Sequence, residues 1–262
     1  MSRPGNEAGL KLVRGGYGGL RGWIEQVEKM GELKRVSGAS WDAEMGAITH
    51  MLTEHSHGTA PALLFDDIPG YPKGHRTLYG HFSSVKRVAL TLGLPLERER
   101  KVDIVKQYYE RIQTMKHMPP RYVKDGPILE NVLTGDAIDV LKFPVPRHHE
   151  ADKARYIGTA NCVITQDPDD GWFNLGCYRN QVYDGKTIGC QITEGKHGRI
   201  HRDKYFARGE KMKVVVLVGQ DPLLFMLAAS PLPDGISELD FAGGLRGEPI
   251  DVIRGPYTGF PI

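Results

Sequence analysis

The chain has few cysteines, no long apolar run and no excess of either charge. Its three cysteines, Cys162, Cys177 and Cys190, form no CxxC pair, so neither a disulfide framework nor a zinc ribbon is expected. No run of about 18 apolar residues occurs, and the first residues lack an apolar core of signal-peptide length, which argues against a membrane span or export. The 34 basic and 32 acidic residues favour neither nucleic acid nor a membrane surface as partner. We expect a soluble, cytoplasmic protein with buried thiols.

Enough apolar sequence is present to build a core. Of the 262 residues, 40% are hydrophobic, which suffices for one large or two ordinary domains. Residues 1 to about 16 are rich in glycine and are expected to form a mobile arm. Helical spacing of apolar residues predicts a helix over 20–30, with Gly31 as its C-cap.

Further apolar runs complete a mixed pattern in the first 120 residues. They predict strands at 33–36 and 62–65 and helices at 43–52, 84–92 and 97–115. The last of these helices carries Val102, Val105, Tyr109 and Ile112 on one face. Pro119 and Pro120 then end the helical pattern. We expect residues 1–120 to form a mixed α/β domain.

Past Pro127 the pattern changes to β-branched and aromatic runs separated by Asp, Gly and Pro. These runs predict strands at 128–133, 156–165, 172–183, 186–192 and 212–218. Asp184 and Gly185 predict a hairpin turn, because glycine can adopt positive φ without steric cost. One helix, over 223–229, is expected to cross this region. The whole chain is therefore predicted to be of the α+β class, with an antiparallel sheet or barrel over residues 121–262.

Three short blocks carry most of the chemically useful side chains. They are NLGCYRNQ, EGKHGRIH and PLPDGISELDFAGGLRG. They supply an amide, an imidazole and a carboxylate at Asn174, His197 and Glu238, which could together ligate a divalent ion. Arg179 and Lys196 offer cationic donors for phosphate or carboxylate groups.

The order of these blocks resembles the UbiD-like family of reversible decarboxylases, which use prenylated FMN. The resemblance extends along nearly the whole chain, through LRGWIEQVEKMGELKRV, ALLFDDIPGYPKG, PVPRHHEADKARYIGTA and VVVLVGQDPLLFMLAASPLP. It implies that residues 121–262 form a split β-barrel that binds prenylated FMN. It also implies an aromatic, heteroaromatic or α,β-unsaturated carboxylic acid as substrate, and a flavin prenyltransferase as the supplier of the cofactor. Loss of CO2 from an sp² carbon leaves a high-energy carbanion, so a cofactor must take up the electrons.

The resemblance also assigns roles to individual residues. Asn174, His197 and Glu238 match the metal ligands, and this donor set suits Mn²⁺ or Mg²⁺ better than zinc. Arg179 matches the active-site arginine that lies near the substrate carboxylate. The matched flavin-binding positions are Thr159, Cys177, Tyr178, Arg179, Gln191, Ile192, Lys196, His197 and Pro231. Relatives often hold a potassium ion (K⁺) near the backbone that corresponds to 228–232.

Two features of the sequence leave alternatives open. Asn174 and Arg179 are five positions apart, which puts them on opposite faces of a regular strand unless Gly176 hosts a bulge. The side chains of His148, His149, Glu150 and Asp152 could ligate a metal, but we expect them to shape the mouth of the barrel.

Relatives continue, after a segment like GPYTGFPI, with a strand that carries two catalytic glutamates and then a further domain. The sequence stops at Ile262, before those glutamates, so we expect the C-terminal family domain to be absent and this chain to have little activity alone. The expected partners are a second copy of the chain or a complementary C-terminal chain. The alternatives are a non-catalytic flavin-binding subunit or fragment that needs a partner chain, and a plain FMN-dependent reductase, which a nicotinamide-dependent activity would favour.

Overall fold

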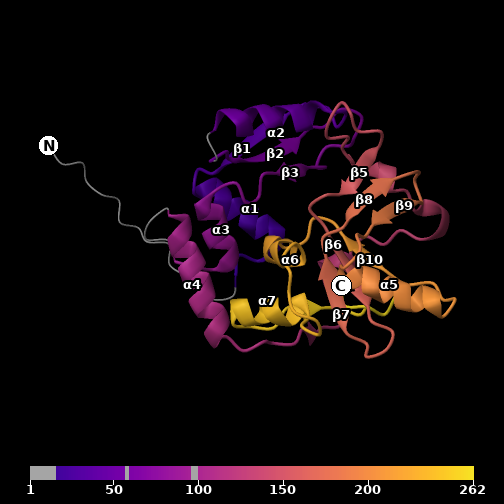
Figure 1. Cartoon of the computed structure of the whole chain (residues 1–262). Coiled ribbons are helices and arrows are strands. Elements are labelled where there is room, and N and C mark those ends of the chain that lie inside the picture. Colours follow the sequence, from indigo (N-terminus) through magenta and orange to yellow (C-terminus); the bar gives the residue numbers. More distant parts are fainter. Residues whose placement is uncertain (1–15, 57–58, 96–99) are drawn as a thin grey trace.

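The computed structural model describes residues 16–56, 59–95 and 100–262 (Figure 1). The arm predicted over residues 1 to 16 therefore lies outside the described residues, apart from Gly16. The N-terminal half contains α1 (Gly19–Lys29), β1 (Leu33–Ser37), α2 (Glu44–His55), β2 (Ala62–Asp66), β3 (Thr77–Tyr79), α3 (Val85–Leu92) and α4 (Lys101–Thr114). The remainder contains β4 (Arg121–Tyr122), β5 (Arg155–Gly158), β6 (Cys162–Gln166), β7 (Phe173–Gly176), β8 (Arg179–Val182), β9 (Ile188–Gln191), α5 (His197–Ala207), β10 (Val215–Leu217), α6 (Pro222–Ala228), α7 (Glu238–Arg246) and β11 (Asp251–Val252).

The N-terminal sheet has the order β1-β2-β3, with β1 and β2 parallel and β2 and β3 antiparallel. Alternation along β2 sends Ala62 and Leu64 toward α1, where Trp23 is buried with them. Leu63 and Phe65 point the other way, into a cluster with residues of α2. The two helices thus cover opposite faces of the sheet, α2 above it and α1 below it in Figure 1. The predicted helices and strands of this half are confirmed, except that the first residues of the helix predicted over 97–115, up to 99, lie outside the described residues.

The face of helix α4 that packs against the core differs from the apolar face predicted from the sequence. Its buried side is formed by Ile104, with Tyr108 and Ile112 packed partly against the main core. Val102, Val105 and Tyr109 lie on the outward side and are 51%, 64% and 61% exposed. The apolar spacing predicted the helix correctly, but most of the predicted apolar face is not the face that packs.

Aromatic rings connect the N-terminal half to the remainder of the chain. The His81 ring lies 5.7 Å from Trp23 of α1 and 5.6 Å from Phe225 of α6, measured between ring centroids. Phe82 stacks on the same Phe225 ring at 5.4 Å. A second connection is made by Tyr17, whose hydroxyl donates a 2.8 Å hydrogen bond to Asp221, the N-cap of α6. These contacts fix the N-terminal half against α6.

The second half contains two antiparallel sheets, ordered β10-β6-β7 and β5-β8-β9, and the parallel pair β11-β4. Two of the long strands predicted from sequence are each broken in two. The run 156–165 divides into β5 and β6, and the run 172–183 divides into β7 and β8, with the members of each pair in different sheets. The sheets found in the described ranges do not close into a barrel, so the split β-barrel stays a prediction.

Helices in this half are more numerous than expected. One helix was predicted, and it is present as α6, but the described part of the chain also contains α5 and α7. The strand predicted at 128–133 is wrong, because Pro127–Leu129 forms a single 3-10 turn there. Without a neighbouring strand, Ile128, Val132 and Leu133 remain exposed.

The hairpin predicted at Asp184 and Gly185 is confirmed, since β8 pairs antiparallel with β9. The reason for glycine at this turn differs from the positive φ that was expected. Gly185 is not among the residues with positive φ. Instead, a Cβ at this position would lie 2.6 Å from Asp139 Oδ1, and the Gly185 carbonyl accepts the N–H of Val140. Close approach of the Asp139 side chain, and not a left-handed turn, favours glycine here.

Two further sequence expectations can be compared with the structure. Within the described ranges, the helices are too short or too polar to cross a bilayer. All three thiols were expected to be buried, but Cys190 is exposed and Cys177 is half-buried.

Candidate functional site

Asn174 lies in the middle of β7 and is 2% exposed. Its strand pairs with β6 in a register that places Thr165 directly opposite. The Asn174 Nδ2 atom donates hydrogen bonds of 3.3 Å to the Thr165 hydroxyl and of 3.3 Å to the Tyr178 hydroxyl. Both amide hydrogens are therefore used. Within residues 16–56, 59–95 and 100–262, no donor is hydrogen-bonded to Oδ1 of this amide.

Glu238 is the first residue of α7 and is also 2% exposed. Its Oε2 atom accepts a 2.7 Å hydrogen bond from the backbone N–H of Leu175, the neighbour of Asn174 in β7. Burial raises the pKa of the Glu238 carboxyl to about 7, against the smaller opposing effect of the Leu175 N–H. A buried carboxylate of this kind is stabilised by a cation. The structure thus brings two of the three predicted metal ligands to one strand.

His197 is the first residue of α5. Its Nε2 atom lies 2.6 Å from Oδ1 of Asp234, in the loop before α7, so the imidazole pairs with that carboxylate and not with Asn174 or Glu238. The next residue, Gly198, donates its backbone N–H to the Tyr178 hydroxyl at 3.0 Å. The described residues contain no cluster of three His, Cys, Asp or Glu side chains arranged for a metal. The start of α5 is therefore linked to Asn174 through Tyr178, while the imidazole has a different partner.

The Tyr178 ring owes its position to two glycines. A Cβ on Gly176 would lie 2.1 Å from the Tyr178 Cζ atom, and a Cβ on Gly198 would lie 2.7 Å from Cε2. Either side chain would displace the ring, since real Cβ contacts are not this short. Gly176 and Gly198 therefore let Tyr178 place its hydroxyl between Asn174 and α5.

A second layer of polar groups lies behind Asn174. His201 is fully buried on α5, and its Nδ1 atom is 2.9 Å from the Thr165 hydroxyl. The Trp172 ring contacts both His201, at 5.1 Å, and His197, at 4.9 Å. Burial lowers the pKa of His201, which keeps the ring neutral near pH 7. The sequence did not identify Thr165, Trp172 and His201 as site residues. The signal that points to Thr165 is the strand pairing, which places a polar residue opposite Asn174.

Several predicted flavin-binding residues lie together in pairs. The Cys177 thiol donates to the Thr159 carbonyl at 3.6 Å. Tyr178 and Ile192 are buried in one apolar cluster with Val163. Arg179 and Gln191 are opposite each other in the β8–β9 register.

The remaining predicted positions are less confined. Lys196 and Pro231 are exposed. Lys196 is the N-cap residue of α5 and makes no side-chain capping bond. The Ala228 carbonyl, in the segment considered for potassium, accepts the backbone N–H of Cys177 at 2.8 Å. The potassium site stays a prediction.

Arg179 begins β8 and is exposed, with its guanidinium carbon 5.7 Å from the centroid of the Tyr156 ring. The chain leaves one sheet after Gly176 and enters another at Arg179, so Asn174 and Arg179 do not share a strand. A bulge at Gly176 is therefore not needed. The irregularity in this region lies in the β5–β8 pairing, between Tyr156 and Gly158.

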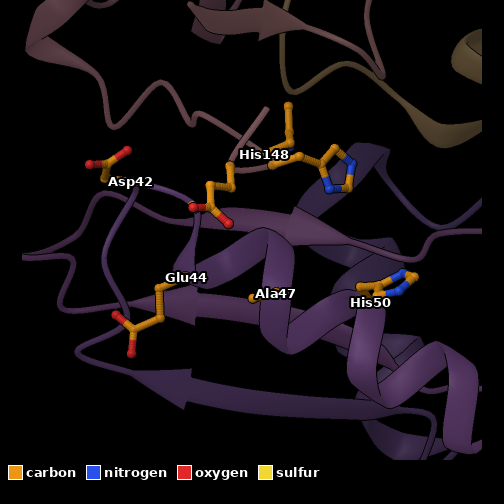
Figure 2. Close-up of a pocket in the computed structure, with 8 residues that line it drawn as sticks. Asp42, Glu44, Ala47, His50 and His148 are labelled. Atoms are coloured by element: carbon orange, nitrogen blue, oxygen red, sulfur yellow. The ribbon is translucent and has the colours of Figure 1, made fainter. Parts of the chain in front are cut away.

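A groove elsewhere contains most of the alternative metal-binding candidates (Figure 2). Its lining residues are Asp42, Ala43, Glu44, Ala47, His50, His148, His149 and Glu150, and Asp152 is not among them. Figure 2 shows Glu44, Ala47 and His50 on α2, Asp42 on the loop before it, and His148 on a separate segment. His148 Nδ1 is 3.0 Å from the Tyr79 hydroxyl, and Asp42 pairs with Arg147 at 2.5 Å. The groove lies against the N-terminal half, apart from the β7 site.

Comparison with known proteins agrees with this arrangement of elements. Residues 24–107 match the family model of the 3-octaprenyl-4-hydroxybenzoate carboxy-lyase N-terminal domain. Residues 121–262 match that of the 3-octaprenyl-4-hydroxybenzoate carboxy-lyase Rift-related domain. The chain belongs to the UbiD family.

Individual relatives give the same assignment. A pyrrole-2-carboxylic acid decarboxylase of Pseudomonas aeruginosa is 32% identical over 250 residues, which cover 92% of this chain and 49% of that protein. The closed form of the vanillic acid decarboxylase of Sedimentibacter hydroxybenzoicus superposes with a TM-score of 0.86 at 26% identity, over 96% of this chain and 52% of that one. An evolved dimeric form of the UbiD-class enzyme HmfF from Pelotomaculum thermopropionicum, in complex with prFMN, has a TM-score of 0.79 at 24% identity, over 93% of this chain and 54% of that one. The chain thus spans about half the length of the relatives it matches.

Proposed function

We propose that this chain forms the part of a UbiD-like carboxy-lyase that holds prenylated FMN and a divalent cation, Mn²⁺ or Mg²⁺. Its substrate would be an aromatic, heteroaromatic or α,β-unsaturated carboxylic acid. The observation that carries the proposal is the attachment of buried Glu238 to the strand of Asn174, whose Oδ1 accepts no hydrogen bond from the part of the chain that the structure describes. The relatives act, by name, on heteroaromatic and aromatic acids, which supports the substrate class.

The residues present suit a hard divalent cation. Asn174 and Glu238 offer an amide oxygen and a carboxylate, the donors that Mg²⁺ and Mn²⁺ prefer. His197 can complete the set, because its present partner Asp234 has a side chain that is 85% exposed and can be exchanged for a cation. The cation would offset the cost of burying the Glu238 carboxylate.

The flavin phosphate would be held at the start of α5. The positive end of a helix dipole attracts anions, and at the start of α5 the His197 N–H would be the donor, because the Gly198 N–H bonds the Tyr178 hydroxyl and the Arg199 N–H bonds the Lys196 carbonyl. Lys196, exposed at the same end, adds a positive charge. A cation on Glu238 and Asn174 would neutralise part of the phosphate charge and fix the position of the cofactor.

The chemistry divides between cofactor and protein. When bound, the prenylated flavin supplies the electron sink for the pair left behind as CO2 departs. Arg179 would orient the substrate carboxylate with its planar guanidinium, although too strong a pair would stabilise the ground state and slow the reaction. A positioned acid, worth about 10² to 10⁴ in rate, must then protonate the product carbon. Glu238 cannot serve while it binds the cation, and Glu194 is an exposed residue before α5.

We further propose that the acid comes from the second half of the enzyme. The relatives are about twice as long as this chain, which supports a partner segment in the same or another polypeptide. The proposed organisation is a mixed α/β domain over 1–120 and a flavin-binding split β-barrel over 121–262, in an oligomer or with a complementary chain. A flavin prenyltransferase would supply the cofactor, and a K⁺ site near 228–232 belongs to the same proposal.

Activity measurements with and without the second half test this function. The chain would be loaded with prenylated FMN and Mn²⁺, and CO2 release from pyrrole-2-carboxylate and vanillate would be measured alone and with the C-terminal half of a relative. We expect release only in the completed enzyme. Plain FMN with a nicotinamide-dependent activity would instead identify a reductase, and CO2 release by the short chain that Glu194→Gln abolishes would place the acid at Glu194.

A further inference from the structure

Four polar side chains form a continuous line behind the Asn174 amide. Asn174 Nδ2 is 3.3 Å from the Thr165 hydroxyl, and that hydroxyl is 2.9 Å from His201 Nδ1. On the far side of the imidazole, His201 Nε2 faces Oδ2 of Asp167 at 3.7 Å. All four residues are 5% exposed or less. The line therefore passes from the Asn174 amide to a buried carboxylate without contact with solvent.

Two proton arrangements give every hydrogen of this line an acceptor within it, and they differ in which atom of Asn174 is free. A third, in which His201 Nδ1 and Asn174 Nδ2 both donate to the Thr165 oxygen, leaves the Thr165 hydroxyl hydrogen without an acceptor among the described residues. If His201 carries its proton on Nε2, Nδ1 accepts from the Thr165 hydroxyl, whose oxygen accepts from Asn174 Nδ2. Oδ1 of Asn174 then points away as a free acceptor. If the proton is on Nδ1, His201 donates to Thr165, the Thr165 hydroxyl donates to Asn174 Oδ1, and the amide turns over. A free NH2 group then replaces the oxygen and cannot bind a cation.

The carboxylate of Asp167 decides between the two arrangements. Within the described residues, His201 Nε2 has no hydrogen-bond partner, and Asp167 Oδ2 is the charged oxygen that faces it. A distance of 3.7 Å is longer than a hydrogen bond, but in a buried site a negative charge still favours N–H over a lone pair in the facing atom. The Nε2–H form of His201 follows.

Asp167 is itself held firmly. Its Oδ1 accepts the backbone N–H of Asp169 at 2.9 Å, and its Oδ2 accepts Lys204 Nζ at 2.6 Å. The oxygen that faces His201 cannot turn away without giving up these partners.

We propose that Asp167, acting through His201 and Thr165, is a positioning residue that holds the Asn174 amide with Oδ1 toward the divalent cation. The inference rests on the proposed function in one respect, the use of Asn174 as a cation ligand. Asp167 touches neither cation nor substrate, and its effect is to select one imidazole tautomer and with it one amide orientation.

Asp167→Asn is the decisive substitution, because it preserves shape and reverses the preferred proton position. The Asp169 N–H would retain the amide oxygen of the new side chain, and Lys204 Nζ would keep Asp169 Oδ2, now 2.9 Å away, as its acceptor, which leaves the new NH2 group facing His201 Nε2. His201 would then carry its proton on Nδ1, and the Asn174 amide would turn over. We expect Mn²⁺ binding to weaken about 10- to 100-fold, measured by titration with Mn²⁺ and electron paramagnetic resonance.

Matched variants separate this effect from charge and from packing. Asp169→Asn makes the same change in net charge two residues away, on an exposed carboxylate that shares Lys204 but does not face His201. It should leave Mn²⁺ affinity within about twofold of wild type. Thr165→Val removes the relaying hydroxyl and should weaken Mn²⁺ binding, whereas Thr165→Ser keeps the hydroxyl and should restore it.

The tautomer can be read without any metal. ¹⁵N NMR of the imidazole nitrogens should show His201 protonated on Nε2 in the wild-type chain and on Nδ1 in Asp167→Asn. An Nδ1–H form in the wild type, or equal Mn²⁺ affinity of wild type and Asp167→Asn, would overturn the inference. If the wild-type chain has the Nε2–H tautomer but binds no Mn²⁺, the proton arrangement is supported. The role of Asp167 in cation binding and the proposed function would then both be overturned.

Discussion

The backbone N–H of Leu175 donates a 2.7 Å hydrogen bond to Oε2 of Glu238, so the first residue of α7 is attached to the strand that carries Asn174. Two residues proposed as cation ligands, 64 positions apart, are thereby attached to one strand. The hydrogen bond uses one carboxylate oxygen and fixes the side chain before any cation arrives. This pre-formed pair is the structural basis of the proposed metal site.

Glu238→Gln should fold but lose most of its affinity for Mn²⁺. Glutamine keeps an oxygen that can accept the Leu175 N–H, but it removes the negative charge that a hard cation requires. Isothermal titration with Mn²⁺ measures the loss, and circular dichroism checks the fold. Glu194→Gln, an exposed glutamate close to His197 in sequence, is the matched control and should bind normally. Unchanged Mn²⁺ affinity in Glu238→Gln would remove Glu238 from the ligand set.

His81 should lower the stability of the chain as the pH falls from 6.5 toward 4, whereas Glu238, whose pKa is raised to about 7, acts in the opposite direction above about pH 4.5. Burial among Trp23 and Phe225 lowers the pKa of His81 to about 4, with a smaller contribution from Arg87. The unfolded chain, with an ordinary histidine pKa near 6.5, binds more protons in this window, so the free energy of unfolding rises with pH. Each pH unit inside the window is worth up to about 1.4 kcal/mol.

Urea denaturation at a series of pH values measures this dependence. His81→Phe keeps an aromatic ring in the cluster and removes the proton site, so the stability of this variant relative to wild type should increase as the pH falls from 6.5 to 4. Arg87 carries the opposing positive charge but does not titrate here, and it stays unchanged. An identical pH slope in wild type and His81→Phe would show that other groups cause the effect.

Gly198→Ala should destabilise the chain by about 1 to 3 kcal/mol, although alanine normally stabilises a helix relative to glycine. The new Cβ would lie 2.7 Å from the Tyr178 ring, which must then move away from Asn174. Thermal denaturation gives the cost, and a double-mutant cycle with Tyr178→Leu assigns it. The penalty should shrink in the Tyr178→Leu background; a penalty of the same size there would mean that the Tyr178 ring is not its cause.

Arg179→Lys should retain the flavin but lose turnover when the enzyme is complete. Arg179 is exposed at the start of β8, so its replacement should leave the core unchanged. A lysine ammonium keeps the charge but cannot form the planar, two-point contact with a carboxylate. Wild type and Arg179→Lys would be compared by kcat and by flavin content. Equal kcat would indicate that charge alone suffices at this position.

The sequence predicts those elements whose apolar pattern matches their packing. α1 follows helical spacing, and β2 is a short apolar run that packs on both faces. α5 was missed because its buried residues are Gly198 and His201, which serve a polar network and leave no apolar stripe. The strand predicted at 128–133 was wrong because the apolar side chains of this run are exposed and have no neighbouring strand.

The same distinction, between what local sequence predicts and what tertiary packing decides, applies to the candidate functional site. Asn174 and Glu238 could be proposed from local motifs, and the structure attaches Glu238 to Leu175, the residue after Asn174 in β7. Thr165, His201 and Asp167 could not, because their importance arises from strand register and from a helix packed over it. The break between Gly176 and Arg179 likewise depends on two sheets that the continuous apolar run does not reveal.

Native mass spectrometry of the chain after co-expression with a flavin prenyltransferase tests the central claim most directly. The account predicts one prenylated FMN and one Mn²⁺ bound to the wild-type chain, with flavin retention that falls when Mn²⁺ is removed or when Asn174 is changed to Ala. Flavin retained equally without Mn²⁺ and in Asn174→Ala, or no prenylated FMN bound to the wild type, would contradict it.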